Sequence, residues 1–182
     1  MPLTRVRVIK PRVGGAFGGK REMMANDFCA AFLAVKTGRP VKVTYTREEV
    51  FSTTRQRHPA RITLKTGVTK DGRVVAKDCH IVMENGAYNG RGPDILASCP
   101  GHITILYRIP NIRFDGYLVY TNNPPGSAFR GFGNPQMRFA DDSQMDVIAA
   151  EMGIDPIDLR RRNVREEGDV TPNKAIITSC GL

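Results

Sequence analysis

The sequence contains no tryptophan and no long run of apolar residues, although 41% of its 182 residues are hydrophobic. A membrane-spanning helix needs about 18 or more consecutive apolar residues, and the sequence has no such run. The opening residues, MPLTRVRVIKPR, also lack the apolar stretch of a signal peptide. These absences predict that the chain neither spans a membrane nor is secreted.

The four cysteines form no recognisable pair. Cys29, Cys79, Cys99 and Cys180 lie far apart without a C-x-x-C motif, and there are only three histidines. This spacing does not fit a zinc site or a disulfide scaffold. We therefore expect small, reduced core cysteines, a cytoplasmic location, and no metal held directly by the side chains of this chain.

The net charge of +9, from 27 Lys and Arg against 18 Asp and Glu, can attract an anionic partner. A nucleic acid is not the expected one, because the basic residues are scattered and no zinc-finger, RRM or homeodomain signature is present. The densest group, Arg160–Arg162 with Arg165, closes a predicted helix, where cations complement the helix dipole. Neither nucleic acid nor a membrane is predicted as a partner.

Alternating apolar residues predict several strands, and an Asp-Gly turn joins two of them into a hairpin. The predicted strands cover residues 6–9, 39–46, 61–68, 73–83 and 112–121. Apolar residues at three- and four-residue spacing predict helices over 22–37 and 135–152, and Asp155 caps a third, short helix. The predicted fold class is therefore α+β, a mixed α/β arrangement with two glycine-rich loops and two to three packing helices.

Three further expectations concern particular segments. The stripe of Met24, Phe28, Ala31 or Phe32, and Val35 on the first helix should face a core. Pro93 and Pro100 should interrupt the segment that follows the hairpin. Residues 166–182 should form a turn-rich tail.

The first glycine-rich loop, Gly14 to Lys20, lies between a predicted strand and a predicted helix. It fits the G-x-x-x-x-G-K part of a phosphate loop, but Arg21 stands where such a loop needs a Ser or Thr to bind Mg²⁺. The Rossmann spacing of glycines is absent as well. Two interpretations stay open: a loop whose Phe17 and Gly18 amides bind an anion or an oxo group, or a tight turn without a ligand.

The second loop, Ser127 to Asn134, places Arg130 between Phe129 and Phe132 at the start of a helix. A guanidinium group between two aromatic rings favours a flat, anionic ligand that is shielded from water. The alternative is a loop packed by its two phenylalanines, with an exposed arginine.

The two loops and their surroundings resemble the molybdopterin-binding subunit of the xanthine dehydrogenase and aldehyde oxidase family of molybdenum hydroxylases. Five segments carry the resemblance in the same order along the chain: VRVIKPRVGGAFGGK, KTGRPVKVTYTREEVFSTTRQRHPA, YRIPNIR, TNNPPGSAFRGFGNPQ and QMDVIAAEMGIDPIDLRRRN. The fold that the resemblance implies is the first molybdenum cofactor-binding domain of the family.

The resemblance also implies roles for individual residues. Phe17 and Gly18 would contact the oxo ligand of the metal or the cofactor through backbone groups. Ala128, Phe129 and Arg130 would contact the molybdopterin, and Phe132 would line the substrate pocket. No catalytic residue is expected in this chain, because the glutamate base of the family lies further downstream.

The implied activity is the hydroxylation of a C–H bond with oxygen from water. Electrons would pass from the molybdenum–molybdopterin cofactor to [2Fe-2S] and FAD centres in partner domains or subunits. The substrate stays open among aldehydes, N-heterocycles and aromatic thioesters. A purine is disfavoured, because purine-oxidising relatives carry an acidic residue at the position of Arg21 and an arginine near that of Ser98.

We expect residues 1–182 to be part of a molybdopterin-binding domain, either excised or one piece of a split subunit, with the remainder of that subunit as a partner. Glu22, Glu48, Glu49 and Glu84 are expected to be solvated residues and not substitutes for the missing base. The alternative function is a noncatalytic assembly or binding module that is inactive alone.

Overall fold

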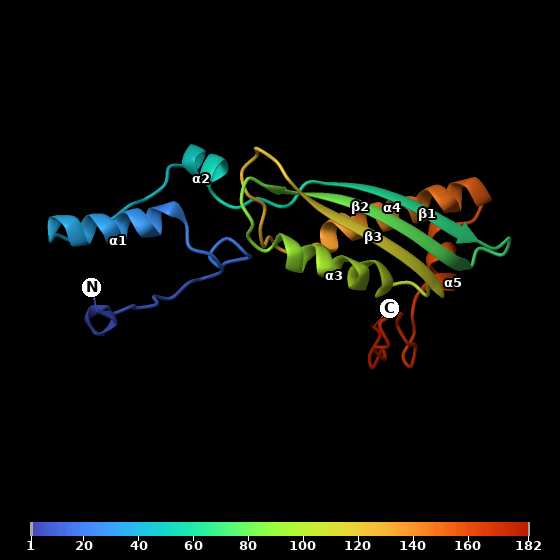
Figure 1. Ribbon diagram of the computed structural model, residues 1–182. Coiled ribbons are helices and arrows are strands. Elements are labelled where there is room, and N and C mark those ends of the chain that lie inside the picture. The colour runs from blue at the N-terminus through green and yellow to red at the C-terminus, as the bar shows by residue number, and fades with distance from the viewer. Residues whose placement is uncertain (1, 182) are drawn as a thin grey trace.

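A three-stranded sheet forms the centre of the computed structural model, which describes residues 2–181 (Figure 1). Strand β1, Ala60–Val68, pairs antiparallel with β2, Val74–Gly86, through a turn in which Gly72 has a φ of 85°. Strand β3, Asn111–Tyr120, pairs with the other edge of β2 in parallel. The predicted hairpin and last strand are confirmed, whereas the pattern did not predict the parallel pairing.

Helices cover one face of this sheet (Figure 1). Helix α3, Gly92–Thr104, connects β2 to β3, and α4, Asn134–Met152, packs beside it. The short helix α5, Pro156–Asn163, packs on α4 and begins with Asp155, whose carboxylate accepts from the Ile157 and Asp158 amides. Among the helices of residues 2–181, none is long and apolar enough to cross a lipid bilayer.

Helix α3 corrects the expectation that two prolines would interrupt this segment. Pro93 lies in the first turn, where its missing N–H costs nothing. Pro100 lies inside the helix, but the helix continues because Ile95, Cys99 and Ile103 recur every four residues and are buried against the sheet. Burial of this face outweighs the one backbone hydrogen bond that Pro100 removes.

The core lies between the sheet and these helices in two clusters. The first contains Cys79, Ile81 and Met83 of β2, Ile95, Cys99 and Ile103 of α3, and Met137 of α4. The second contains Val74, Tyr107, Ile109, Met145, Ala149 and Leu159. The apolar stripe of α4 therefore faces the core of this domain.

The N-terminal arm differs from the expectation. No residue between 2 and 57 is buried, and helix α1, Ala25–Thr37, lies far from the sheet (Figure 1). The arm also contains a 3₁₀ turn, Leu3–Arg5, and helix α2, Arg47–Thr53. Residues 6–9 and 39–46 form no strand, because within residues 2–181 no strand pairs with them and alternation alone cannot satisfy the backbone.

The apolar stripe of α1 is exposed, so the prediction that it faces a core is wrong for the described residues. Phe28 is 59% exposed, and Phe32 and Val35 are each 65% exposed. The helix also begins at Ala25, three residues later than predicted. Neighbouring large apolar side chains on one exposed face are typical of a surface that another protein segment covers.

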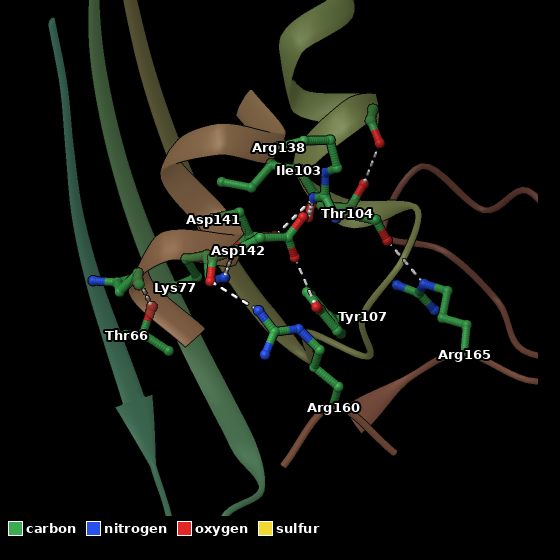
Figure 2. Close-up of polar contacts among 12 residues, drawn as sticks. Thr66, Lys77, Ile103, Thr104, Tyr107, Arg138, Asp141, Asp142, Arg160 and Arg165 are labelled. Atoms are coloured by element: carbon green, nitrogen blue, oxygen red, sulfur yellow. Dashed lines mark hydrogen bonds and ion pairs between the residues drawn. The ribbon is translucent and has the colours of Figure 1, made fainter. Parts of the chain in front are cut away.

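A buried ionic network joins the sheet to α4 (Figure 2). The Lys77 ammonium group and the Asp141 carboxylate are both fully buried and form an ion pair. Arg138 donates to the second Asp141 oxygen at 2.7 Å and to the Ile103 carbonyl at 3.1 Å. Asp141 thereby compensates two cations at once. A buried charge is costly unless an opposite charge compensates it in this way.

The cysteines fall into two exposed and two buried residues. Cys29 and Cys180 are exposed, whereas Cys79 and Cys99 have no accessible surface. Burial raises the pKa of the Cys79 thiol to about 12 and that of the Cys99 thiol to about 11. Both buried thiols therefore stay protonated at neutral pH and react poorly, because the thiolate is the nucleophile.

We expect a pulse of iodoacetamide at pH 8 to modify Cys29 and Cys180 and to leave Cys79 and Cys99 unmodified. Mass spectrometry of tryptic peptides gives the modified fraction of each cysteine. The same pulse in denaturant should modify all four. Equal rates for Cys79 and Cys29 in the folded chain would contradict the burial of the β2 face.

Candidate functional site

The first glycine-rich loop follows an extended segment and precedes α1. Its backbone turns through the left-handed region, with φ of 52° at Gly14, 49° at Phe17 and 105° at Gly18. Phe17 is one of three non-glycine residues with positive φ within residues 2–181. A bulky side chain in this conformation is strained, and such strain concentrates at functional sites.

The second loop also has left-handed backbone, again at a phenylalanine. Gly131, Phe132 and Gly133 follow one another with φ of 98°, 48° and 94°. The Phe132 amide donates to the Phe129 carbonyl at 2.9 Å. Gly133 then serves as the N-cap of α4, so the loop ends where the helix begins.

Two side chains of α3 hold the Phe132 backbone. The Ser98 hydroxyl donates to the Phe132 carbonyl at 3.0 Å, and His102 Nε2 contacts the same oxygen at 3.1 Å. Because α3 belongs to the core, the strained Phe132 is fixed to a rigid element. The partly buried Phe132 side chain also packs against the first core cluster, so its ring offers a supported surface for a planar ligand.

The two loops touch, although about 110 residues separate them in the sequence. A Cβ atom placed on Gly18 would lie 2.6 Å from the Ala128 carbonyl carbon and 3.0 Å from Phe129 Cα. Gly18 is therefore required for a close approach of two backbones, as well as for its φ. The structure thus brings together all five predicted cofactor residues and Phe132.

The joined loops line an open hollow of about 390 Å³. Its lining contains the predicted residues Phe17, Gly18, Ala128, Phe129, Arg130 and Phe132, together with Ala16, Lys20, Arg21 and Gly131. The volume is within the range of small-molecule sites. A larger hollow of about 490 Å³ lies over the strands near Lys77 and Arg113, but no residue of its lining has positive φ.

Each phenylalanine of the hollow has an arginine against its ring. Arg130 of the second loop lies 5.5 Å from the Phe17 ring centroid, and Arg21 of the first loop lies 5.9 Å from that of Phe132. Each loop therefore places an arginine against an aromatic ring of the other loop. Cation–π contacts of this kind contribute about 0.5–1 kcal/mol at exposed sites.

Arg57, which sequence reasoning missed, contacts the second loop at Phe129 and Arg130. Its guanidinium group lies 4.6 Å from the Phe129 ring centroid and donates to the Arg130 carbonyl at 2.6 Å. Partial burial lowers the pKa of Arg57 through desolvation, but an arginine remains charged. No local signal marks this residue, because its partners lie more than 70 residues away in the chain.

Glu22 also differs from its expectation. Its carboxylate pairs with Arg55 at 3.0 Å and accepts from the Ser127 hydroxyl, and the side chain is only 20% exposed. It is therefore not a solvated residue but a link between the end of the first loop and the start of the second. Because the Glu22 carboxylate is engaged by Arg55 and Ser127, it does not line the hollow.

The charge of the hollow is entirely positive. Its titratable lining residues are Lys20, Arg21 and Arg130, and it has no acidic side chain. Within residues 2–181, the amides of Phe17, Gly18, Ala128 and Phe129 donate no hydrogen bond. The same part of the chain contains no cluster of three or more His, Cys, Asp or Glu side chains that could hold a metal. The arrangement suits an anionic, oxygen-rich ligand.

Comparisons with known proteins agree with this geometry. Residues 1–164 match a family model described as the molybdopterin cofactor-binding domain. The chain is 43% identical over 172 residues to a probable xanthine dehydrogenase component of Bacillus subtilis. It is 40% identical to the nicotinate dehydrogenase large molybdopterin subunit of Eubacterium barkeri.

Among solved structures, the aldehyde oxidoreductase of Desulfovibrio gigas superposes with a TM-score of 0.81 at 36% identity, covering 90% of this chain and 18% of that one. The alignments cover 94% and 100% of this chain, but only 23% and 43% of the Bacillus and Eubacterium proteins. The chain therefore spans less than half the length of these relatives.

Proposed function

Because this chain belongs to the molybdopterin cofactor-binding domain family, we propose that it is part of the molybdenum subunit of an oxidoreductase like the xanthine dehydrogenases and aldehyde oxidoreductases. The proposed reaction is the hydroxylation of a C–H bond in an aldehyde or an N-heterocycle with oxygen from water. The bound cofactor supplies the redox chemistry, and the residues of this chain hold and orient it.

The observation that carries this proposal is the joining of two donor-rich loops at Gly18 and Ala128. The unpaired amides of Phe17 and Gly18 would donate to oxygen atoms of the cofactor, and those of Ala128 and Phe129 would do the same from the opposite side. Arg130 would add a guanidinium group with its planar set of donors. These residues fit an oxygen-rich anion without any side chain that ligates the metal.

The aromatic residues would exclude water from the site. Phe17 is 70% exposed and Phe129 is 48% exposed, so both rings offer apolar surface that a bound cofactor or substrate can cover. Phe132 is half-buried and fixed by α3, and we assign it to the substrate pocket. A planar substrate would stack on this ring.

The proton-accepting base is proposed to come from outside this chain. The hollow has no carboxylate, and Glu22 is engaged by Arg55 and Ser127. Turnover therefore needs further parts of the molybdenum subunit as well as [2Fe-2S] and FAD centres in partner domains or subunits. The exposed stripe of α1 supports such a partner segment, and the free cysteines agree with a cytoplasmic location.

Replacing Arg130 with alanine in the assembled enzyme tests the cofactor assignment. We expect the molybdenum and pterin contents per protein to fall together, because the variant loses its charge-assisted donors to the cofactor. Loss of hydrogen bonds to a charged group weakens binding by about 1.5–3 kcal/mol. Metal analysis and pterin fluorescence after denaturation give the two contents.

Arg61→Ala is the matched control, since Arg61 is an exposed arginine on β1 outside the hollow. It should retain the wild-type contents. If Arg130→Ala keeps full molybdenum and pterin, Arg130 does not bind the cofactor. An assembled wild-type enzyme that contains neither would contradict the proposed function itself.

A further inference from the structure

Glu22 joins the two glycine-rich loops outside the lining of the hollow. Its carboxylate accepts a hydrogen bond from the hydroxyl of Ser127, the residue before Ala128. In the part of the chain that the structure describes, this is the one hydrogen bond between the two loop segments, residues 14–22 and 127–134. The bond therefore lies next to Ala128, at which the first loop touches the second.

The bond between Glu22 and Ser127 is shielded from water. Ser127 is 2% exposed, and the Glu22 side chain is 20% exposed. The backbone at Gly90, between β2 and α3, lies close to both groups. A Cβ atom placed there would be 3.2 Å from Glu22 Oε2 and 3.2 Å from Ser127 Oγ. A hydrogen bond to a charged group is stronger in such a shielded place than in water.

Arg55 holds the same carboxylate from a third segment. Its Nε atom lies 3.0 Å from Glu22 Oε2, and its side chain is 23% exposed. The next residue, Gln56, is bonded to the second loop, because its carbonyl accepts from the Ser127 amide at 3.0 Å. Arg55 and Ser127 thus have fixed positions relative to each other, and the Glu22 carboxylate connects both to the first loop.

The other attractive contacts between the loops are weaker. They are two arginine–phenylalanine contacts at largely exposed sites, with 5.5 Å and 5.9 Å to the ring centroids. A cation–π contact of this kind contributes less than a hydrogen bond to a charged group. The described part of the N-terminal arm supplies no buried residue up to position 57 that could hold the first loop. The placement of the first loop therefore depends mainly on Glu22.

We propose that Glu22 is a positioning residue for the cofactor: through Ser127 and Arg55 it holds the two loops at the separation at which the amides of both can bind one anionic cofactor. Glu22 does not touch this ligand, because neither it nor Ser127 lines the hollow. Donors that are already ordered bind more tightly, because binding then costs less conformational entropy. The inference rests on the proposed function, which supplies the cofactor as the ligand of the hollow.

The negative charge of Glu22 gives positioning a distinct sign. The titratable groups that line the hollow are all cations. By charge alone, removal of a nearby carboxylate would strengthen the binding of an anion. Loss of the bond that orders the loops would instead weaken it. A fall in cofactor content without Glu22 therefore indicates positioning and not an electrostatic effect.

The test compares Glu22→Ala and Ser127→Ala, singly and together, by the molybdenum and pterin contents of the assembled enzyme. We expect Glu22→Ala to retain the cofactor roughly 10- to 100-fold less well, because a hydrogen bond to a charged group is lost. Ser127→Ala should also lower the contents. The double variant should lose no more than Glu22→Ala, because both changes remove the same contact. Glu48→Ala, which removes an exposed glutamate of α2, is the matched control and should keep the wild-type contents.

Urea unfolding of the cofactor-free 182-residue chain separates positioning from general stability. We expect the same midpoint for wild type and Glu22→Ala, since Glu22 lies outside both core clusters. Full or raised cofactor contents in Glu22→Ala would overturn the proposal, as would additive losses in the double variant or a lowered urea midpoint. An assembled wild type without cofactor would refute the proposed function instead.

Discussion

Gly18→Ala is expected to separate the two loops and to empty the cofactor site, although it adds a single methyl group. That group would lie 2.6 Å from the Ala128 carbonyl carbon and 3.0 Å from Phe129 Cα, and both neighbours are backbone atoms that cannot rotate away. The φ of 105° at this position is unfavourable for alanine in addition. The loop must therefore move.

The expected loss follows from the backbone strain. Strain of this kind costs about 1–3 kcal/mol, which corresponds to a roughly fivefold to 150-fold weaker retention of the ligand that needs the loops joined. Molybdenum and pterin contents of the assembled enzyme measure the effect. The melting temperature should change little, because the first loop lies outside both core clusters.

Gly19→Ala provides a control one residue away. Its added methyl group would meet only the Ala16 carbonyl oxygen, at an ordinary 3.5 Å, and its φ is not positive. We expect normal cofactor contents in this variant. Equal losses in both variants would show that the glycines matter for flexibility and not for the contact at Ala128.

The parts of the fold that follow local rules were predictable. The hairpin follows from Asp71-Gly72 between alternating runs, and α5 follows from Asp155 and Pro156 at its start. Helix α2 also has a local signal at its start: Thr46 and Glu49 form a capping box, with the Glu49 carboxylate 2.7 Å from the Thr46 amide.

Long-range contacts decided the remainder. Residues 39–46 alternate like a strand, but a strand needs a neighbour, and none pairs with them within residues 2–181. The apolar stripe of α1 has the pattern of a core helix and no core to face in the described chain. A periodic pattern indicates that one face of a helix is apolar, but it does not indicate which segment covers that face.

The residues of the candidate site also divide into those with a local sequence signal and those that depend on long-range contacts. The glycines and phenylalanines of both loops could be identified from the sequence, because backbone donors and positive φ depend on local composition. The supporting contacts of Arg57 and Glu22 could not, because each joins segments far apart in the chain. Their contribution depends on distance in space, about which spacing in the sequence says nothing.

The second large effect is expected for Asp141→Ala in the ionic network of the core. Asp141 compensates both Lys77, which is fully buried, and Arg138, whose side chain is 17% exposed. Removing the carboxylate leaves the fully buried Lys77 ammonium group without its partner (Figure 2). Breaking a buried pair in this way costs about 3–5 kcal/mol of unfolding free energy, which urea unfolding of the 182-residue chain measures.

The control lies on the same helix. Asp146 also forms an ion pair, with Arg160 at 2.7 Å, but its side chain is 59% exposed. Asp146→Ala should leave the urea midpoint nearly unchanged, because water screens an exposed pair and replaces the lost contact. The two variants therefore remove the same chemical group from one helix, but Asp141 is fully buried and pairs with two cations, whereas Asp146 is exposed and pairs with one.

A double variant separates the penalty of an orphaned charge from the value of the pair. In Lys77→Met with Asp141→Leu, both fully buried charges disappear and apolar side chains fill the volume, while Arg138 keeps its bond to the Ile103 carbonyl. We expect the double variant to be more stable than Asp141→Ala, because burying an unpaired ion costs more than losing a compensated pair. If Asp141→Ala were no less stable than Asp146→Ala, water would have to reach Lys77, and the dry contact between β2 and α4 would be disproved.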